Sequence, residues 1–428
     1  MTREFKRRDF IKFVGAGAAA TLAGCATETM APKPAGRVFV IGGGFGGATA
    51  AKYIRMWSGG AIQVFLVERE QQFVSCPLSN LVLAGSRTIE QNTRGYGKLR
   101  DYGVTVLQGE VAAIDPQKRL VKFKAKYGDM SYDRLVLAPG IDFMYDQLPG
   151  LNNAEAQKQV LHAWKAGEQT VALRKQLEAM PDGGVFLFSF PKMPYRCPPG
   201  PYERVCQVAD YLKRAKPRSK ILVLDANPDI VSKKGLFLAA WNDQYKGIIE
   251  YRPNQEARDV DVRGRTVKTE FDSFKGDVLN VVPPQRAGAI AAQAGVVTAN
   301  NRWCEVNWLT TESIKVPNIH VIGDATQSAA GMPKSGSMAN QQAKIAASAI
   351  VALMTGQQVN QTPMINNTCY SYTSATEAMH VTSIHAWDPA KKTLLPVKGA
   401  GGVSPARSTL EKQFADGWAI NIWNDMLG

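Results

Sequence analysis

The stretch that decides the fold is Arg37-Val38-Phe39-Val40-Ile41-Gly42-Gly43-Gly44-Phe45-Gly46-Gly47. A short apolar strand, Arg37–Ile41, runs into glycines spaced Gly42-x-Gly44-x-x-Gly47, and an amphipathic helix is predicted to follow as far as Trp57. Gly42 permits a tight turn, and Gly44 lets the backbone approach a pyrophosphate. Gly47 lets the helix pack closely on the sheet, so that its N-terminus faces the phosphates.

A second strand completes a strand–helix–strand unit around this turn. Ile62–Val67 is apolar and ends at Glu68, which lies 21 residues beyond Gly47. At this spacing a carboxylate can accept hydrogen bonds from both ribose hydroxyls of a dinucleotide. Because strand, helix and acid are in register, the pattern favours dinucleotide binding over an unliganded glycine-rich turn. The expected contacts are Gly42, Gly44, Gly46, Gly47 and Glu68.

The rest of the chain alternates strands and helices in two blocks. In the first block, further strands are predicted at Val104–Gln108, Leu120–Ala125 and Leu135–Ala138. After Gly150, helices are predicted at His162–Met180 and Tyr202–Ala215, and strands at Gly184–Phe190 and Lys220–Asp225. A strand at Asn318–Ile322 and a helix over roughly residues 337–354 follow, before a mixed tail from Gly356 onward. This order indicates an α/β protein with two doubly wound units.

A late carboxylate gives a second, independent signal. The apolar strand ending at Ile322 is followed by Gly323-Asp324, which places an acid at the edge of the sheet where open α/β folds bind ligands. Taken alone, such a pair usually caps a turn. Together with the early glycines, it resembles flavoprotein disulfide reductases. In those, Asp324 would bind the ribityl chain, and the next helix would point its positive end at the flavin pyrimidine ring.

The second block lacks a glycine fingerprint of its own. Its first strand leads into Pro191-Lys192-Met193-Pro194, and no glycine follows until Gly200. Prolines cannot form the glycine turn, and the missing glycines deny a pyrophosphate close approach to the backbone. We therefore predict that the second unit binds no nicotinamide.

The composition is that of a basic globular protein. Its 428 residues have a net charge of +14, of which the first 30 contribute little, with five Lys/Arg against three Asp/Glu. The basic residues are scattered, and no RRM, KH or helix-turn-helix pattern occurs, so nucleic acid is not an expected partner. A basic surface can also steer anions or an acidic protein toward the molecule.

The first residues are typical of an export leader. The twin-arginine motif Lys6-Arg7-Arg8-Asp9-Phe10 precedes an apolar run, Phe13–Cys25, of about 13 residues, which is too short to span a bilayer. It predicts transport of the folded protein to the periplasm. Leu22-Ala23-Gly24-Cys25 resembles a lipoprotein-processing box, which would anchor Cys25 to lipid. Ordinary cleavage before Gly36 is favoured, because such boxes arise easily in Ala/Gly-rich leaders.

The cysteines limit the redox chemistry. There are six, at positions 25, 76, 197, 206, 304 and 369, and five of them follow the leader. Export permits disulfides, but an odd number leaves at least one cysteine free or modified. No Cys-x-x-Cys-His occurs, so no c-type haem is expected on this chain, and no Cys/His spacing predicts a metal site.

Seven segments together resemble a known family, the flavoprotein subunit of flavocytochrome c sulfide dehydrogenase, over roughly residues 36–428. They are Gly42–Ala51, Ser75–Asn80, His162–Gln169, Arg196–Arg204, Pro283–Gly288, Met332–Gly336 and Asn367–Ser371. The resemblance implies two doubly wound Rossmann-like, FAD/NAD(P)-binding domains plus a C-terminal α+β domain. The expected parts are a leader and linker (1–35), an FAD-binding domain in two pieces (36–150 and 280–355), a second domain (151–279), and a C-terminal domain (356–428) that contains Cys369 and contacts the cytochrome.

The resemblance also assigns three cysteines. Cys76 matches a residue that bonds FAD through a thioether, and Cys197 with Cys369 matches a redox disulfide beside the flavin. From the residues alone, a Cys197–Cys369 bond could equally be a structural bridge that pins the tail to the second domain. Cys206 and Cys304 are expected to be small buried apolar residues. Further cofactor contacts are expected from Ser79, Asn80, Val111, Ala138, Gly140, Gly323, Asp324, Pro333 and Lys334.

The implied reaction is the oxidation of sulfide. Hydrosulfide would attack the Cys197–Cys369 disulfide, leaving a persulfide and a thiolate, and two electrons would pass to FAD. Sulfur would leave as elemental sulfur or polysulfide. Glu203, six residues after Cys197, is the candidate for proton handling. It could equally be an ordinary carboxylate at a helix start.

The implied partner is a separate c-type cytochrome subunit, which would receive the electrons singly in a heterodimer. One alternative is a sulfide:quinone oxidoreductase, which needs an apolar surface that dips into the membrane. Residues 405–428 mix charged and apolar residues, which argues against it. A second alternative is a non-catalytic accessory or sulfur-binding flavoprotein of a thiosulfate-oxidising system.

Overall fold

The glycine turn leaves an inner strand of a seven-stranded sheet. Strand β1 (Gly36–Ile41) pairs in parallel with β2 (Ile62–Glu68) on one side and with β9 (Arg134–Leu137) on the other. Residues 38–41 are buried, as expected of a strand covered on both faces. The strand order is β19 (Val306–Asn307), β20 (Glu312–Ser313), β21 (Ile319–Val321), β9, β1, β2 and β5 (Thr105–Gln108).

The computed structural model describes residues 35–428. The twin-arginine motif, the apolar run and Cys25, on which the predictions of export and of a lipid anchor rest, lie outside the described residues. Within residues 35–428, no helix is both long and apolar enough to cross a membrane.

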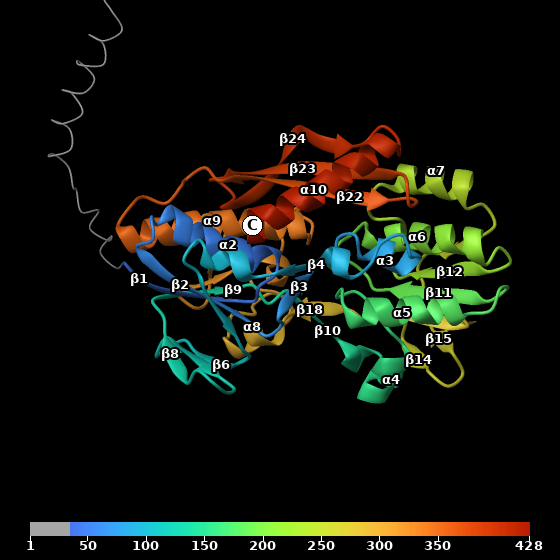
Figure 1. Ribbon diagram of the computed structural model, residues 1–428, viewed down its shortest axis with the longest axis horizontal. Coiled ribbons are helices and arrows are strands. Elements are labelled where there is room, and N and C mark those ends of the chain that lie inside the picture. Colours follow the sequence, from blue (N-terminus) through green and yellow to red (C-terminus); the bar gives the residue numbers. More distant parts are fainter. Residues whose placement is uncertain (1–34) are drawn as a thin grey trace, which may run out of the picture. The chain divides into compact units, whose positions relative to one another are not determined.

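Helices and a small sheet cover opposite faces of the large sheet (Figure 1). On one face, α2 (Phe45–Trp57) packs against α9 (Gly336–Thr355). Small residues meet there, including Ala48 and Ala51 of α2 and Ala343 and Ala347 of α9, so the two helices can approach closely. On the other face lie α8 (Ala289–Gln293) and the antiparallel strands β6 (Val111–Asp115), β7 (Leu120–Phe123) and β8 (Asp129–Ser131).

A second sheet is parallel throughout. Its order is β13 (Ile249–Arg252), β12 (Lys220–Asp225), β11 (Val185–Phe190) and β17 (Val278–Val281). Four helices lie near this sheet: α3 (Ser79–Ala84), α5 (Glu168–Ala179), α6 (Gly200–Ala215) and α7 (Lys234–Gln244). Below them in the view of Figure 1 lie α4 (Ala154–Gln159) and a small antiparallel sheet of β14 (Asp259–Asp261), β15 (Thr266–Lys268) and β16 (Ser273–Lys275). The predicted doubly wound α/β class is confirmed, because both large sheets have parallel strands joined by helices.

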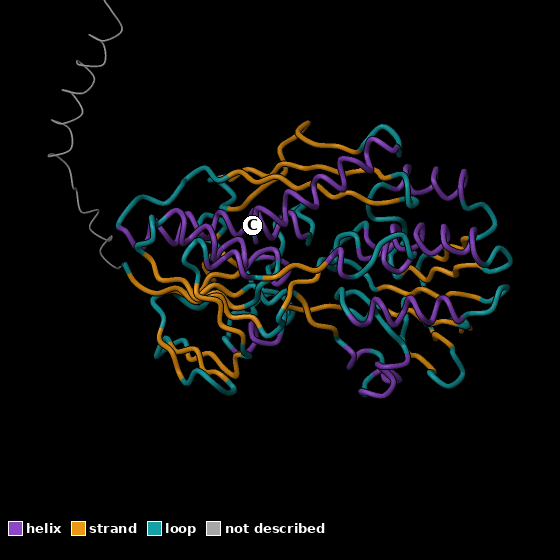
Figure 2. The backbone as a smooth tube through the Cα atoms, viewed as in Figure 1, coloured by secondary structure: helices purple, strands orange, loops and turns teal. Residues whose placement is uncertain are grey.

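The tail forms an antiparallel sheet and a helix. Strands β22 (Met364–Tyr372), β23 (Ala378–Asp388) and β24 (Thr393–Val403) pair in sequence, and α10 (Thr409–Leu427) packs on β23 and on α2. Figure 2 shows these long strands running above both α/β units. The chain also forms two short two-stranded sheets. They pair β3 (Gln72–Val74) with β4 (Thr93–Gly95) and β10 (Ile141–Phe143) with β18 (Gln285–Ala287). The domain boundaries at 150, 279 and 355 stay predictions.

One predicted helix, His162–Met180, is wrong in its first third. The helix begins only at Glu168, and the preceding residues 162–167 form an irregular loop. Ala163 has a left-handed backbone with φ of 45°, and the carbonyl oxygens of His162 and Ala163 accept hydrogen bonds from Arg204. Because these carbonyls bond across to another helix, they are not available for helical hydrogen bonds. The loop lines the site described below.

Trp423 tests how far α10 stabilises the first unit. Its side chain is 3% exposed, and the Arg94 guanidinium lies 4.1 Å from its ring centroid. We expect Trp423→Ala to lower the free energy of unfolding by about 3–5 kcal/mol, because it leaves a cavity in the core cluster beneath α10. The measurement is the urea midpoint followed by circular dichroism.

Ile420→Ala is the matched control, since Ile420 lies on the same helix and is 54% exposed. We expect a change within roughly 0.5 kcal/mol for this variant. Equal midpoints for the two variants would mean that α10 does not contribute to the core through Trp423.

Candidate functional site

The glycine turn is built on two close backbone contacts. A Cβ on Gly47 would lie 1.7 Å from the carbonyl oxygen of Gly42, and a Cβ on Gly42 would lie 2.4 Å from that of Ala138. Gly42 also has φ of +101° and donates its N–H to Val67 O at 2.9 Å. A Cβ on Gly44 would meet no atom within 4 Å, so this residue faces open space at the N-terminus of α2. The turn therefore leaves the room that a pyrophosphate needs.

Glu68 lies at the carboxyl end of β2, beside this turn. Its Oε2 accepts the N–H of Gly43 at 2.6 Å, and its Oε1 accepts the N–H groups of Arg69 and Glu70 at 2.8 Å and 3.0 Å. Three backbone donors therefore fix the carboxylate at the rim of the cavity. This is the position from which an acid contacts a ribose in a dinucleotide-binding unit.

Asp324 lies where β21 ends, in the single turn Gly323–Ala325. Its Oδ1 is buried without a hydrogen-bond partner, and burial raises the pKa of its carboxyl group. Close by, the 20-residue helix α9 begins at Gly336, with Ser335 accepting the N–H of Met338 at 3.0 Å as its N-cap. An unpaired buried carboxylate oxygen and a positive helix end at one cavity indicate a polar ligand with an electron-rich edge.

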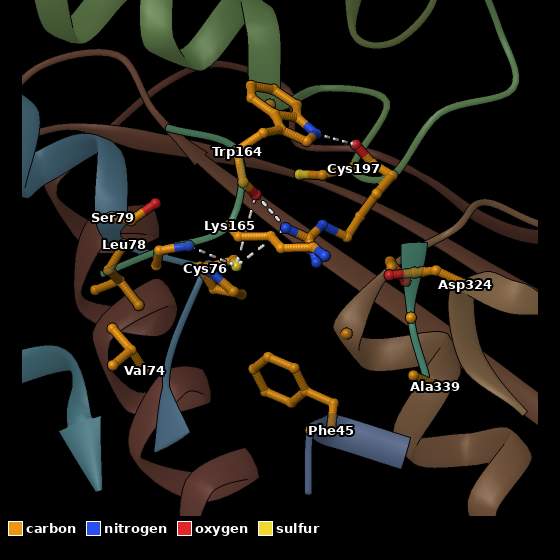
Figure 3. A pocket seen from close by; sticks show the side chains of 18 of the residues that line it. Phe45, Val74, Cys76, Leu78, Ser79, Trp164, Lys165, Cys197, Asp324 and Ala339 are labelled. Carbon is orange, nitrogen blue, oxygen red and sulfur yellow. Dashed lines mark hydrogen bonds between the residues drawn. The ribbon is translucent and has the colours of Figure 1, made fainter. Parts of the chain in front are cut away.

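A cavity of about 730 Å³ joins these features. Figure 3 shows Phe45, Cys76, Cys197 and Asp324 arranged around it. The free space at Gly44, the carboxylate at Glu68 and the unpaired oxygen of Asp324 fit the pyrophosphate, ribose and ribityl groups of FAD in the order that the sequence predicts. The cavity is large enough for a cofactor of this kind.

Most of the sequence-predicted residues line this cavity. They are Gly44, Gly46, Glu68, Cys76, Ser79, Asn80, Ala138, Gly140, Cys197, Glu203, Gly323, Asp324 and Cys369. Gly42, Gly47, Val111, Pro333 and Lys334 are not among the lining residues. Gly42 and Gly47 shape the turn from behind, and Val111 pairs with Phe123 in the small sheet. Cofactor contacts of these five residues stay predictions.

Lys334 points its side chain away from the cavity. Its Nζ donates to the carbonyl oxygens of Asp324 and Thr326, at 3.0 Å and 2.5 Å, and lies 3.7 Å from the centroid of the Trp303 ring. Its own carbonyl accepts the N–H of Cys197 at 2.7 Å. Lys334 therefore links the Asp324 turn to the segment that contains Cys197.

Cys76 lies in the loop before α3, and its sulfur is surrounded by donors. The N–H of Ala166 and the guanidinium of Arg196 both lie 3.4 Å from Sγ. Arg196 also donates to the carbonyl of Trp164. These two donors hold the sulfur in place at the wall of the cavity.

Cys197 and Cys369 reach the same cavity from separate elements. Cys197 has φ of +62° and lies three residues before α6, whereas Cys369 lies within β22. Both are free thiols in the structure. Burial raises the pKa of each thiol, and for Cys197 the neighbouring Cys369 and Glu203 add to the rise. Cys206 and Cys304 are buried and do not line the cavity.

Glu203 connects three elements around these sulfurs. From the first turn of α6, its Oε1 accepts the N–H of Tyr372 at 2.9 Å, and its Oε2 accepts Asn80 Nδ2 at 2.8 Å. It is 8% exposed, and burial raises its pKa. A carboxyl group with a raised pKa beside two thiols can take up and return a proton.

Sequence reasoning missed several charged residues of the site. Arg196 and Lys165 lie inside the segments that carried the resemblance, so their positions could have been noted. Lys165 forms an ion pair with Asp142 at 3.1 Å at the cavity wall. Arg204 and Lys233 are buried close to Glu203 and the thiols, and Lys233 lies in an unremarkable Ser-Lys-Lys stretch that contains no sequence signal.

The second unit uses its own edge carboxylate internally. Asp225, at the end of β12, accepts hydrogen bonds from the hydroxyls of Tyr202 and Tyr251 at 2.9 Å and 2.8 Å. It also accepts Asn227 Nδ2 at 2.8 Å. The acid that would contact a nicotinamide-side ribose is therefore already bonded, which agrees with the lack of glycines after β11.

A pair of glycine variants separates folding from cofactor binding. We expect Gly47→Ala to destabilise the flavin-free protein by roughly 3 kcal/mol or more, because the new Cβ meets backbone that cannot move aside. Gly44→Ala should change the stability of the flavin-free protein by no more than about 1 kcal/mol, because its Cβ enters open space. The same variant should lose bound FAD, because the new methyl group fills the room that the pyrophosphate needs. Urea midpoints and the flavin absorbance of purified protein report the two effects. A Gly47→Ala protein with wild-type stability and flavin content would contradict the close contact.

Three family descriptions match this chain. Pyridine nucleotide-disulphide oxidoreductase matches residues 36–179. The central part of the sulfide dehydrogenase (flavocytochrome c) flavoprotein chain matches residues 170–283, and the flavin-binding part of flavocytochrome c sulphide dehydrogenase matches residues 361–427. The matched regions contain the glycine turn, Cys197 and Cys369.

Curated relatives fall in two groups. Mitochondrial sulfide:quinone oxidoreductase of Mus musculus is 25% identical over 307 residues, which cover 68% of this chain and 65% of the relative. The one of Dictyostelium discoideum is 22% identical with the same coverage, so the chain spans slightly less than two thirds of their length. The sulfide dehydrogenase (flavocytochrome c) flavoprotein chain of Chlorobaculum thiosulfatiphilum is 56% identical over 46 residues, which cover 11% of this chain and 94% of that one.

Solved structures share the fold. The sulfide:quinone oxidoreductase of Aquifex aeolicus superposes with a TM-score of 0.72 at 18% identity, covering 91% of both chains. The putidaredoxin reductase–putidaredoxin complex gives 0.65 at 16% identity, covering 92% of this chain and 94% of the matched one. With the site geometry, the three family matches and the Chlorobaculum relative, the chain belongs to the family of flavocytochrome c sulfide dehydrogenase flavoprotein chains.

Proposed function

We propose that this chain catalyses the FAD-dependent oxidation of sulfide to elemental sulfur or polysulfide and passes the electrons to a c-type cytochrome subunit. The observation that supports this most directly is the arrangement of Cys197 and Cys369. They lie 172 positions apart in sequence, yet both line the cavity that contains the dinucleotide cradle. A structural bridge would have no need to open onto a cofactor cavity.

When bound, FAD supplies an acceptor for two electrons that can be released one at a time. The chain's part is to hold it. The N-terminus of α2 would hold the pyrophosphate, Glu68 the adenosine ribose and Asp324 the ribityl hydroxyls. The unpaired Oδ1 of Asp324 would gain a partner in this way, which would remove the cost of a buried acceptor without a donor.

The cysteines perform the sulfur chemistry. Hydrosulfide attacks one sulfur of a Cys197–Cys369 disulfide, so that one S–S bond forms and another breaks, leaving a persulfide and a thiolate. Return of the thiolate to the inner sulfur would only expel hydrosulfide again, so the disulfide re-forms with release of sulfur only when two electrons are removed. The persulfide anion and the thiolate would together give up two electrons to bound FAD, the disulfide would re-form, and the outer sulfur of the persulfide would leave in the zero oxidation state. One proton leaves for each hydrosulfide consumed.

Glu203 is the proposed acceptor of that proton. Its carboxylate is held at the sulfur site by Tyr372 and Asn80, and burial raises its pKa toward the range where it can take up a proton. The same two hydrogen bonds also join α3, α6 and β22, so Glu203 has a structural part as well.

Cys76 is the proposed point of a covalent bond to FAD. Its sulfur faces the cavity and lies 3.4 Å from both Arg196 and the N–H of Ala166. A covalently held cofactor suits a protein exported in its folded state, as the twin-arginine leader predicts, because FAD lost in the periplasm is not easily replaced. Periplasmic location is part of this proposal.

A second function, sulfide:quinone oxidoreductase, is favoured by one observation. On α10, the large apolar residues Leu410, Phe414 and Ile420 are each at least half exposed, although residues 405–428 read as mixed in sequence. Such residues could contact a cytochrome or a membrane surface.

Stopped-flow reoxidation of the sulfide-reduced protein separates the two functions. Transfer to a c-type cytochrome and not to a soluble quinone analogue supports the first, and the reverse supports the second.

Cysteine variants test the redox role of the pair. Anaerobic sulfide should bleach the flavin absorbance of the wild-type protein. In Cys197→Ser or Cys369→Ser we expect the bleaching rate to fall by at least ~10³-fold, because neither variant can form the disulfide that hydrosulfide attacks.

Cys206→Ala is the control for these variants. Cys206 lies on α6, where its sulfur accepts Trp241 Nε1 at 3.3 Å away from the cavity, and this variant should bleach at the wild-type rate. Colourless wild-type protein, or flavin that sulfide does not bleach, would favour a non-catalytic sulfur-binding role.

Mass spectrometry under denaturing conditions tests the covalent bond. We expect wild-type protein to be heavier than its sequence mass by one FAD, and Cys76→Ser to lack this addition while still binding FAD in the native state. The non-covalent contacts at Gly44, Glu68 and Asp324 are unchanged in that variant. Unmodified wild-type protein would refute the covalent bond without affecting the proposed reaction.

A further inference from the structure

Lys233 is a buried ammonium group next to the cysteine pair. It precedes the first turn of α7 in a left-handed conformation with φ of 54°, and it is 7% exposed. Its Nζ donates to the carbonyl oxygen of Cys369 at 3.0 Å and to Ser371 Oγ at 2.7 Å, both on β22. Both partners are neutral groups.

Arg204 is a second buried cation with only neutral partners. It is 2% exposed and donates to Asn80 Oδ1, Asn280 Oδ1 and the carbonyl oxygens of His162 and Ala163, all within 3.0 Å. Glu203 is the buried carboxyl that influences both cations. Neither cation is bonded to a carboxylate in the part of the chain that the structure describes.

A buried cation that bonds only to neutral groups is costly unless negative charge forms beside it. The groups that face Lys233 are Cys369 from β22, Glu203 from α6, Cys197 from the segment before α6, and Glu411 from α10. Cys369 has the largest favourable effect on the ammonium among them. The cysteine sulfurs are thus the groups on which a balancing negative charge can form.

We propose that Lys233 is a positioning residue for the thiol–disulfide chemistry, whose ammonium stabilises negative charge on Cys369 when the Cys197–Cys369 bond is opened. The inference rests on the proposed function of the pair. If hydrosulfide attacks Cys197, the electron pair of the broken bond stays on Cys369 as a thiolate. If it attacks Cys369, the new persulfide there ionises to an anion. The proton goes to Glu203 in both cases, and Lys233 keeps its own.

The pKa values agree in direction. Burial lowers the pKa of Lys233 to about 8, so the ammonium is charged below that pH and neutral above it. Burial raises the pKa of the Cys369 thiol, and Lys233 is the first of the groups that oppose this rise. Removing the charge should therefore raise the thiol pKa further.

The test measures the thiol directly, in holoprotein whose disulfide has been reduced with a phosphine. The rate of Cys369 alkylation by iodoacetamide is followed against pH by peptide mass spectrometry, since the thiolate is the reacting form. Lys233→Gln keeps a hydrogen-bond donor and removes the charge. We expect its Cys369 pKa to rise by about one unit, which is about tenfold slower alkylation at neutral pH.

Lys234→Gln is the matched control. Lys234 is the neighbouring residue, pairs with Asp229 at 2.5 Å and is about half exposed, so its loss should leave the Cys369 pKa unchanged. If Lys233 only tied α7 to β22, Lys233→Gln would lower stability and leave the thiol pKa at the wild-type value. That result, with flavin content unchanged, would overturn the proposal.

Lys233→Arg keeps the proposal testable if the glutamine variant does not fold. Above pH 8 the Lys233 ammonium, with its pKa of about 8, loses its proton, whereas the guanidinium of an arginine at the same position stays protonated. Flavin reduction by sulfide should therefore decline above this pH in the wild type and persist in Lys233→Arg. Identical alkaline limbs would refute the role of the charge. Wild-type protein that exposes no new thiols on reduction would instead refute the redox pair, which distinguishes the two failures.

Discussion

The contact between Gly47 and the carbonyl oxygen of Gly42 is the constraint on which the site depends. It brings the first turn of α2 against the end of β1, so that the helix N-terminus and Glu68 meet at one edge of the sheet. Any side chain at residue 47 would push the helix away. Since α9 and α10 both pack on α2, their positions depend on the same contact.

The redox end of the cavity depends on a different balance, that of buried charge. Arg204, Lys233 and Glu203 are almost wholly excluded from water, and each is bonded to backbone or amide groups from other elements. These bonds hold β22 against α6 and α7, and the tail strand with Cys369 is thereby held beside the loop with Cys197. The same groups that fix the geometry also set the electrostatics of the thiols.

The loop of residues 162–167 joins the two ends. Sequence periodicity indicated a helix there, but Arg204 and Asn280 bond to its carbonyl oxygens and keep it out of a helix. In this form, Ala166 N–H reaches Cys76, and the ring of Trp164 lies over Arg204. Tertiary hydrogen bonds outweighed local helix propensity, which differs little between residue types.

The second α/β unit has a parallel sheet like the first but no glycine fingerprint after its first strand. Without the glycines after β11, its edge acid Asp225 bonds to two tyrosines and an asparagine, which satisfies a buried carboxylate inside the protein. The unit instead supplies two helices to the sulfur site. Glu203 lies in the first turn of α6, and Lys233 directly precedes α7. A fold that elsewhere binds a dinucleotide here supports a pair of thiols.

The sequence by itself determined the first unit closely. The glycine spacing, Glu68 and Asp324 are encoded by short-range patterns, because turn geometry and strand ends depend on neighbouring residues, and all three lie where predicted. Resemblance, and not physics, chose Cys197 and Cys369 among ten pairings of five cysteines. Only the tertiary structure decided that Lys233 and Arg204 face the thiols, that Lys334 turns away from the cavity, and that residues 162–167 are a loop. These depend on buried contacts between segments far apart in the chain, where the cost of an unpaired charge or carbonyl is settled by partners that no local pattern specifies.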